Sequence, residues 1–369
     1  MNVELKIEYV GMMGQGVAHG ADGNIYFVPG ALPGDQVLAK SEGKKKYRDA
    51  ELVEVLVPSE QRTEPACKVF RECGGCDWLD WDYSAQLKAK ETLLRRALER
   101  SQWMPEVFLP TKAADSSFGY RNRIQLHSDG KRLGFYKRRS HSVVDIPSCP
   151  VAHPALNEAI AKIRAEGVNG TRKIELSVQS DGQVLRQDNS PHGAAGFSQV
   201  NDAQNAWMRE HVAFLLKASG ASSVLELYAG NGNFTSAYLD QVQELFALDS
   251  SATALEQARA LYGDRTHPRA AFVEAHIDGR VGKRLPAEFR RRYDTILLDP
   301  PRTGAEAVLE PLIHEGVKTV VYVSCAPVAF TKDVQCLKDN FRFDQVQIVD
   351  MFPHTRHIEF VALFSRLPS

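Results

Sequence analysis

Hydrophobic and polar residues alternate along the first part of the chain. Within residues 1–58, the run 4–10 places apolar side chains at nearly every second position, the runs 24–28 and 49–57 are rich in β-branched or aromatic residues, and turn residues separate the runs. Successive side chains of a strand point to opposite faces, so this spacing is typical of short half-buried strands. The pattern predicts a small β-barrel over residues 1–58.

The spacing changes after a polar link. Residues 84–103 place Leu87, Leu94 and Leu98 at helical intervals behind Ser84, a residue type that caps helices, so one amphipathic helix is expected there. From residue 110 to about 198 the pattern again indicates mainly strands. We therefore predict a central β-rich domain over residues 59–200.

The remaining region, residues 201–369, alternates helical stretches with nearly continuous apolar runs. Strands that are apolar throughout are buried on both faces, which is typical of a parallel sheet covered by helices. The pattern predicts a Rossmann-like α/β domain. Its expected strands are 223–229, 244–249, 270–276, 293–299, 319–325 and 358–364.

Composition adds little to this picture except what it excludes. The chain has 369 residues, of which 43% are hydrophobic and 25% are charged, and no apolar run approaches the length of about 20 residues that a bilayer requires. The first residues alternate like a strand and lack the features of a signal peptide. We expect a cytoplasmic protein without a membrane span.

A net charge of -1 means that a nucleic-acid partner would have to be held by local patches. Residues 120–141 form the strongest such patch. This patch contains many basic residues, a single acidic residue and interleaved aromatic residues. The basic side chains can bind phosphates and the aromatic rings can stack on bases. A solvated charged face is the alternative. The cations are Arg121, Arg123, Lys131, Arg132, Lys137, Arg138 and Arg139.

A glycine-containing turn follows the first predicted strand of the α/β region. Gly230 and Gly232 lie in it, and Asp249 ends the next strand, where a carboxylate can accept hydrogen bonds from ribose hydroxyls. Thr235 occupies the place of the third glycine in the dinucleotide fingerprint. S-adenosylmethionine therefore fits better than NAD, and an ordinary glycine turn is the alternative.

Four cysteines have the spacing of a metal centre. Cys67, Cys73 and Cys76 lie close together, and Cys149 is more distant. Four thiolates can bind zinc or an iron–sulfur cluster, and the spacing does not choose between them. Unligated or disulfide-paired cysteines are less compatible with a reducing compartment.

Two further residues end neighbouring strands of the α/β region. Asp299 precedes two prolines, and Cys325 ends the next strand, so both should lie at the same sheet edge. Asp299 could instead cap a helix, and Cys325 could be a buried apolar residue, as Cys336 is expected to be.

A thiol beside a methyl donor has a specific use. Carbon 5 of uracil accepts a methyl group once a thiolate has added to carbon 6, and a base must then remove the carbon 5 proton. Glu359, at the start of the last strand, is the candidate base, with His354 and His357 as rivals.

Taken together, these motifs resemble the RNA 5-methyluridine methyltransferase family, especially the iron–sulfur members that modify uridine in large-subunit ribosomal RNA. The resemblance covers essentially the whole chain. It implies an OB-like, TRAM-type RNA-binding barrel, a central iron–sulfur domain and a class I S-adenosylmethionine-dependent methyltransferase domain. The residues that carry it are GQGVAHGADGNIYFVPGALPGD, CKVFRECGGCDWLDWDYSAQLKAK, YRNRIQL, LGFYKRRSHSVVDIPSC, FSQVN, ELYAGNGNF, LLDPPR, SCAP with TKD, and HIEF.

The resemblance also implies residue roles. Cys325 is similar to the nucleophile, Glu359 to the base and Asp299 to a residue of the donor and uracil pocket. Four cysteines resemble the ligands of a [4Fe-4S] cluster: Cys67, Cys73, Cys76 and Cys149. The implied donor-binding positions are Gln199, Tyr228, Asn233, Asp249, His276 and Asp299, and the implied RNA-contacting positions are Phe197, Arg121 and Arg123.

The implied activity is methylation of carbon 5 of a specific uridine by a monomer that binds RNA, through a covalent cysteine–carbon 6 adduct. Transfer-RNA members of the family share the catalytic motifs but usually lack the cluster, so ribosomal RNA is the expected target and transfer RNA the alternative. A non-enzymatic iron–sulfur RNA-binding protein would not need the SCAP segment and Asp299. A small-molecule methyltransferase would not need the barrel and the basic strands.

Overall fold

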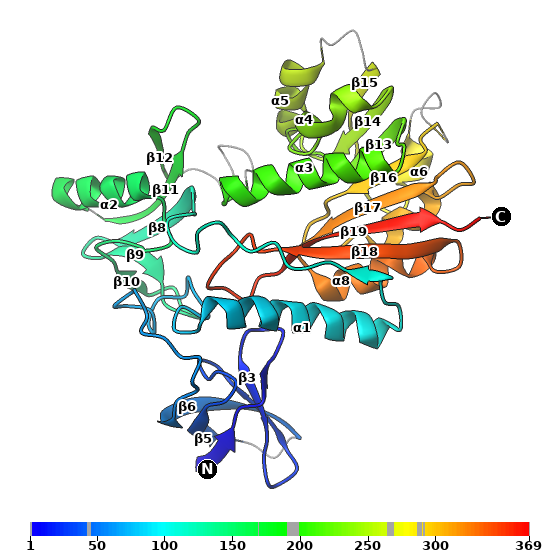
Figure 1. Ribbon diagram of the computed structural model, residues 1–369. Coiled ribbons are helices and arrows are strands. Elements are labelled where there is room, and N and C mark those ends of the chain that lie inside the picture. The colour runs from blue at the N-terminus through cyan, green and yellow to red at the C-terminus, as the bar shows by residue number, and fades with distance from the viewer. Residues whose placement is uncertain are drawn as a thin grey trace. The chain divides into compact units, whose positions relative to one another are not determined.

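The computed structural model describes residues 2–42, 46–168, 170–189, 199–263, 269–285, 290 and 292–368. The chain divides into two compact units, each assembled from separate stretches (Figure 1). Unit 1 contains Met1–Leu93, Asp115–His192 and Phe352–His357. Unit 2 contains Leu94–Ala114, Gly193–Met351 and Ile358–Ser369.

The first sheet of unit 1 has six strands in the order β1-β5-β6-β4-β3-β2. All neighbours are antiparallel except β4 and β6, and the buried side chains include Leu5, Tyr26 and Val37. The strands predicted in this region are present, while their closure into an OB-like barrel stays a prediction. The strands are β1 (Asn2–Lys6), β2 (Tyr9–Val10), β3 (Gly16–His19), β4 (Ile25–Val28), β5 (Gln36–Ser41) and β6 (Tyr47–Val57).

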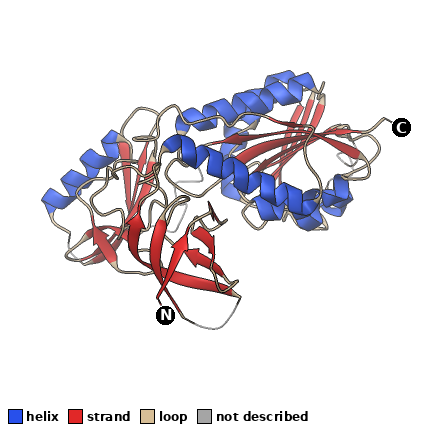
Figure 2. Ribbon diagram, turned by 60° about the horizontal axis from the view of Figure 1, so that its bottom comes forward, coloured by secondary structure: helices blue, strands red, loops and turns tan. Residues whose placement is uncertain are grey.

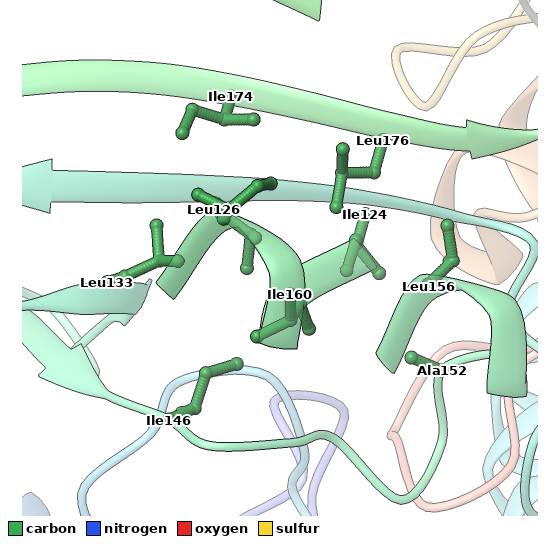
Figure 3. Packing of buried hydrophobic residues seen from close by; sticks show 10 residues of the cluster. Ile124, Leu126, Leu133, Ile146, Ala152, Leu156, Ile160, Ile174 and Leu176 are labelled. Atoms are coloured by element: carbon green, nitrogen blue, oxygen red, sulfur yellow. The ribbon is translucent and has the colours of Figure 1, made fainter. Parts of the chain in front are cut away.

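The second sheet of unit 1 is fully antiparallel, in the order β10-β9-β8-β11-β12. Helix α2 (Pro154–Glu166) covers one face, where its side chains pack on those of β8 and β11 (Figure 3). The sequence interpretation missed this helix, although Leu156, Ile160 and Ile163 follow helical spacing. The strands are β8 (Arg123–Asp129), β9 (Leu133–Tyr136), β10 (Val143–Asp145), β11 (Thr171–Val178) and β12 (Val184–Asp188).

Helix α1 (Tyr83–Ser101) confirms the predicted amphipathic helix, with Leu94 and Leu98 buried. Its cap differs from the prediction. Asp82, not Ser84, accepts the hydrogen bond from the backbone N–H of Ala85 at 3.1 Å. The Asp82 carboxylate, just before the first turn of α1, also interacts favourably with the positive end of the helix dipole.

Unit 2 is built on an eight-stranded mixed sheet in the order β15-β14-β13-β16-β17-β19-β18-β7. The first five strands are parallel, as predicted, but β19 runs antiparallel to both β17 and β18, so the all-parallel expectation is corrected there. The strands are β7 (Val107–Phe108), β13 (Ser223–Leu227), β14 (Glu244–Asp249), β15 (Arg269–Glu274), β16 (Thr295–Leu298), β17 (Thr319–Ser324), β18 (Phe341–Val349) and β19 (Glu359–Arg366).

Helices lie on both sides of this sheet (Figure 2). They are α3 (Asp202–Ala218), α4 (Thr235–Tyr238), α5 (Ala252–Tyr262), α6 (Val281–Arg284), α7 (Glu306–Leu309) and α8 (Pro327–Asp333). Helices on both faces of parallel strands make unit 2 a doubly wound domain. In the described part of the chain, no helix has the length and apolar character needed to cross a bilayer.

Candidate active site

The turn after β13 adopts a backbone conformation that favours glycine at two positions. Gly230 and Gly232 have φ angles of 56° and 84°, a region that residues with a Cβ rarely adopt, and Tyr228 adopts 60° despite its side chain. Asp249 holds the turn, since its carboxylate accepts hydrogen bonds from the N–H groups of Gly230 and Ser251, both at 2.8 Å. The result is a hydrogen-bonded turn with a fixed carboxylate beside it.

Two asparagines secure the far side of this turn. Asn233 and Asn205 exchange side-chain hydrogen bonds of 2.9 and 3.0 Å. Asn205 lies on α3 and was not singled out from the sequence, because no local motif marks it. Tyr228, which was predicted to lie in this pocket, is half-buried, and burial raises its pKa to about 12, so its hydroxyl stays protonated.

Glu226 is a buried carboxylate next to this turn that the sequence interpretation overlooked. It lies on β13, is only 2% exposed, and accepts hydrogen bonds of 2.5 Å from the hydroxyls of Thr235 and Tyr238. Burial raises its pKa to about 7. Its one signal in the sequence is a carboxylate within an otherwise apolar buried strand. The bond from Thr235 also explains why a hydroxyl residue, not glycine, occupies that position.

Asp299 and Cys325 end adjacent parallel strands, as predicted. β16 pairs with β17 up to Leu298 and Tyr322, so the two residues leave the sheet at the same edge. The backbone N–H of Asp299 also lies 3.4 Å from the carbonyl of Leu227 on β13. Burial, followed by the nearby charge of Glu226, raises the pKa of Asp299 above its ordinary value.

The loop after Asp299 is tied back to the sheet by a residue of the TKD segment. Asp333 accepts hydrogen bonds from the backbone N–H of Ala305, at 2.6 Å, and from the hydroxyl of Tyr322. The Asp333 side chain lies against Gly304, whose φ is 82°, so a Cβ at that position would meet the carboxylate. These contacts fix the course of the chain just beyond Asp299.

Glu359 lies opposite Cys325 in the sheet. β17 and β19 pair antiparallel with Ser324 across from Phe360, and continuing this register by one residue sets Cys325 across from Glu359. Glu359 is 4% exposed. The structure therefore brings together the predicted nucleophile, the predicted base and Asp299.

The surroundings of Cys325, Glu359 and Asp299 raise the pKa of all three groups, so each group stays protonated to a higher pH than it would in water. Burial first, and then the charges of Glu359 and Asp299, raise the pKa of Cys325 to about 11. Burial and the charge of Asp299 raise the pKa of Glu359 well above its ordinary value. Arg302 opposes both shifts and is the cation that favours the charged forms of Cys325 and Glu359.

The rival bases belong to unit 1, not to the unit of Cys325. His354 is 4% exposed, and its Nδ1 lies 3.1 Å from Nε2 of Gln86. Its ring also packs against Phe118 with a centroid separation of 4.6 Å. His357 donates its backbone N–H to Thr355 and contacts the ring of Phe352. These surroundings are those of structural residues.

The remaining predicted donor-binding positions are less closely grouped. Gln199 is 9% exposed and belongs to unit 2. Phe197, the predicted base contact, lies outside the described residues. The side chain of His276 is 76% exposed and lies 3.8 Å from Asp278 just beyond β15. A role for His276 in donor binding stays a prediction.

Four cysteines line a single cavity of about 170 Å³ in unit 1, namely Cys67, Cys73, Cys76 and Cys149. Asn157 of α2 fixes the Cys149 backbone by accepting from its N–H at 2.8 Å and donating to its carbonyl at 3.0 Å. Burial raises the pKa of Cys73, Cys76 and Cys149. Among the described residues, no three or more His, Cys, Asp or Glu side chains are arranged to hold a single metal ion.

The two predicted RNA-contacting arginines have other partners. Arg121 lines the cysteine cavity. Arg123 forms a largely buried ion pair with Glu175, which argues against its use as a phosphate ligand. The RNA-binding role of Arg123 stays a prediction.

The face of the second sheet opposite α2 carries aromatic and polar groups. The rings of His127 and Tyr136 stack with centroids 3.7 Å apart, and His141 meets Tyr136 edge-on at 5.1 Å. Strand pairing sets Lys173 across from His127. We call these four residues the ring face.

Unit 2 thus has the fold of a Rossmann-like methyltransferase. A solved structure with this architecture is the Pyrococcus abyssi tRNA (uracil-54, C5)-methyltransferase in complex with S-adenosyl-L-homocysteine. It matches with a TM-score of 0.76 at 24% identity, over 98% of this chain and 100% of that one, which shows the shared fold.

The sequence comparisons define the family. The model of the tRNA (Uracil-5-)-methyltransferase family matches residues 172–367. An uncharacterized RNA methyltransferase of Bdellovibrio bacteriovorus is 30% identical, over 98% of this chain and 94% of its own length. The 23S rRNA (uracil(1939)-C(5))-methyltransferase RlmD of Vibrio cholerae is 29% identical, over 92% of this chain and 90% of its own. The chain belongs to the tRNA (uracil-5-)-methyltransferase family and is an RNA methyltransferase.

Proposed function

We propose that this protein uses S-adenosylmethionine to methylate carbon 5 of a specific uridine in 23S ribosomal RNA. The observation that carries the proposal is the position of Cys325 opposite Glu359 and beside Asp299 at one sheet edge. Relatives named as 23S rRNA methyltransferases support ribosomal RNA as the target. Transfer RNA is the second candidate, because the solved structure with the same fold is a tRNA methyltransferase.

The proposed reaction uses a covalent adduct. The Cys325 thiolate adds to carbon 6 of the uracil, and the resulting enolate attacks the donor methyl group through carbon 5, releasing S-adenosylhomocysteine. The Glu359 carboxylate then removes the carbon 5 proton, and the electron pair of that C–H bond re-forms the double bond as the thiolate leaves. Protonated Asp299 can donate a hydrogen bond to the uracil ring.

The donor pocket follows from the turn geometry. Asp249, held by two backbone N–H groups, retains lone pairs for the ribose hydroxyls of the donor. Tyr228 and Asn233 flank the same turn, and Gln199 and His276 complete the proposed set. The doubly wound fold supports this placement, since ligands of such sheets bind beyond the carboxyl ends of the strands.

The four cavity cysteines are proposed to hold a [4Fe-4S] cluster. Four thiols that line one cavity support this proposal, because cysteine thiolates are the usual ligands of such a cluster. When bound, the cluster would supply a rigid cross-link among the loops of unit 1. Cys67, Cys73, Cys76 and Cys149 would be its ligands.

RNA binding is assigned to unit 1. The predicted division into a TRAM-like barrel (1–58), a cluster domain (59–200) and a methyltransferase domain (201–369) remains part of this proposal, as does a cytoplasmic monomer. The ring face could stack with unpaired bases while the exposed Lys137 and Arg139 contact phosphates. The target uridine must leave its stack to reach Cys325.

The test is to incubate the protein with labelled donor and either 23S rRNA or a tRNA pool, and then to analyse nucleosides. We expect label in 5-methyluridine from 23S rRNA, none with Cys325→Ala, and an RNA-linked protein band with Glu359→Gln. Label only in tRNA would establish the second candidate. The proposal fails if Cys325→Ala still makes 5-methyluridine, or if no RNA is labelled.

A further inference from the structure

The loop that carries three of the cavity cysteines is bonded to the connection between β18 and β19. Asp77 directly follows Cys76, and its carboxylate is only 10% exposed. One carboxylate oxygen accepts from the Arg356 guanidinium at 3.2 Å, and the other accepts from the Arg356 backbone N–H at 3.1 Å. The backbone N–H groups of Asp77 and Trp78 both donate to the carbonyl of His354, at 2.9 and 3.0 Å.

Helix α1 holds the same connection from another side. Gln86 accepts from the His354 backbone N–H at 2.9 Å, and the ammonium of Lys90 donates to the Phe352 carbonyl at 2.9 Å. Both Gln86 and Lys90 are fully buried. The hydroxyl of Tyr120 adds a bond of 3.1 Å to the Pro353 carbonyl.

These bonds impose an uncommon backbone conformation. His354 has a φ of 62°, a left-handed conformation that costs free energy for any residue with a Cβ. Such a conformation persists only where the surroundings over-determine it, and here both backbone polar groups of His354 have buried partners. Gln86 satisfies its N–H, and the Asp77–Trp78 peptide region satisfies its carbonyl.

The held segment leads directly into the proposed base. Phe352–His357 belongs to unit 1, whereas Glu359, two residues further on, begins β19 in unit 2. We propose that Asp77 is a positioning residue that couples the cysteine loop to the placement of Glu359, acting through Arg356 and His354. This inference rests on the proposed function of Glu359. The cysteine loop would then influence the elimination step as well as hold the proposed cluster.

The coupling has a definite kinetic signature. If Asp77 positions the base, its loss slows removal of the carbon 5 proton, while addition by Cys325 and methyl transfer continue. A displaced base of this kind lowers kcat by roughly ten- to hundredfold. Donor KM stays unchanged, because the turn after β13 is not involved. A variant that had only lost folded protein would instead lose all steps in the same proportion.

The experiment compares Asp77→Ala and Arg356→Ala with Asp129→Ala, a control carboxylate that also binds an arginine and backbone N–H groups but lies on a hairpin away from the cysteines. Hydrogen exchange of peptides covering 352–358, iron content, kcat, donor KM and adduct accumulation are measured on the full chain. We expect at least tenfold faster exchange in 352–358, unchanged iron, the fall in kcat and a build-up of RNA-linked protein. The control should match the original protein.

The outcomes separate this inference from the proposed function. Unchanged exchange and kcat in both variants would overturn the coupling even if 5-methyluridine is made normally. Faster exchange with an undiminished elimination rate would also overturn it. Arg356→Ala decides the matter if Asp77→Ala loses iron, because it removes the guanidinium bond to Asp77, although not the backbone N–H bond, without altering the cysteine loop. A protein that makes no 5-methyluridine at all refutes the proposed function instead, while the exchange data still report the anchoring.

Discussion

Asn205 of α3 and Asn233 of the donor turn hold each other through two reciprocal amide hydrogen bonds of 2.9 and 3.0 Å. The pair joins the turn after β13 to α3, which begins at Asp202, two residues beyond Val200. The turn that is proposed to bind the donor is therefore held in part by a residue that lies outside it.

Asn205→Ala should weaken donor binding. The substitution leaves the amide of Asn233 without its partner, and one hydrogen bond of this kind contributes about 1 kcal/mol, or roughly fivefold in affinity. Calorimetric titration with S-adenosylhomocysteine measures the effect. Glu210→Ala, an exposed change on the same helix, is the control and should bind normally. Equal affinities for all three proteins would contradict the role given to the pair.

Adduct formation should accelerate as the pH rises. Cys325 acts as a thiolate, and its pKa is raised to about 11, so below that pH the thiolate fraction grows about tenfold for each pH unit. Glu359 acts deprotonated in the later elimination step and also has a raised pKa, so elimination should likewise accelerate as the pH rises. Single-turnover rates between pH 6 and 9 test this expectation. A rate that falls with pH would show that a protonated group limits the reaction.

Glu359→Gln should move the pH profile of the addition step to lower pH. The Glu359 charge raises the pKa of Cys325, and the neutral amide removes that effect. RNA-linked protein should therefore form at a lower pH than the transient adduct of the original enzyme does. A profile displaced to higher pH would mean that Glu359 assists ionisation of the thiol.

Protein purified without air should contain about four irons per chain. Cys73→Ser removes one proposed ligand and should lower the iron content strongly, with little effect on donor affinity, because the donor turn belongs to unit 2. Cys336→Ser is the matched control, since this cysteine lies on unit 2 beside Asp333 and away from the cavity. Zinc in place of iron would overturn the assignment of the cluster.

Tyr136→Ala should weaken RNA binding. Base stacking on an aromatic ring contributes about 1–3 kcal/mol, which corresponds to a loss of roughly fivefold or more in affinity. Arg186→Ala is the control, because strand pairing sets Arg186 on the α2 side of the same sheet, where it binds Asp188 and Glu166. The measurement is the affinity of each variant for a single-stranded rRNA fragment. If the two variants bind equally well, the ring face is not a stacking surface.

The parallel part of the fold was predictable because its strands are apolar throughout. Asp299 and Cys325 were likewise predictable as neighbours, since consecutive parallel strands deliver their carboxyl ends to one edge. The antiparallel course of β19 was not, because a buried strand has the same apolar pattern in either direction. The opposition of Cys325 and Glu359 follows from that direction, so only the structure reveals it.

Other features depended on contacts between distant segments. β18 mixes polar and apolar residues along an irregular register, which concealed it within the sequence pattern. Glu226 and Asn205 acquire their roles from partners on other elements. The ion pair of Arg123 was also not predictable, because its partner Glu175 lies 52 residues away.

The interleaving of the two units has a consequence for how the chain is made. Unit 1 includes Phe352–His357. Backbone N–H and carbonyl groups of this segment form hydrogen bonds with buried partners on α1 and just after Cys76. Translation proceeds from the N-terminus, so the four cavity cysteines leave the ribosome long before this segment does. The unit that contains them cannot complete its native bonds until translation has passed almost three hundred residues beyond Cys73, and cluster insertion before that point would act on an unfinished scaffold.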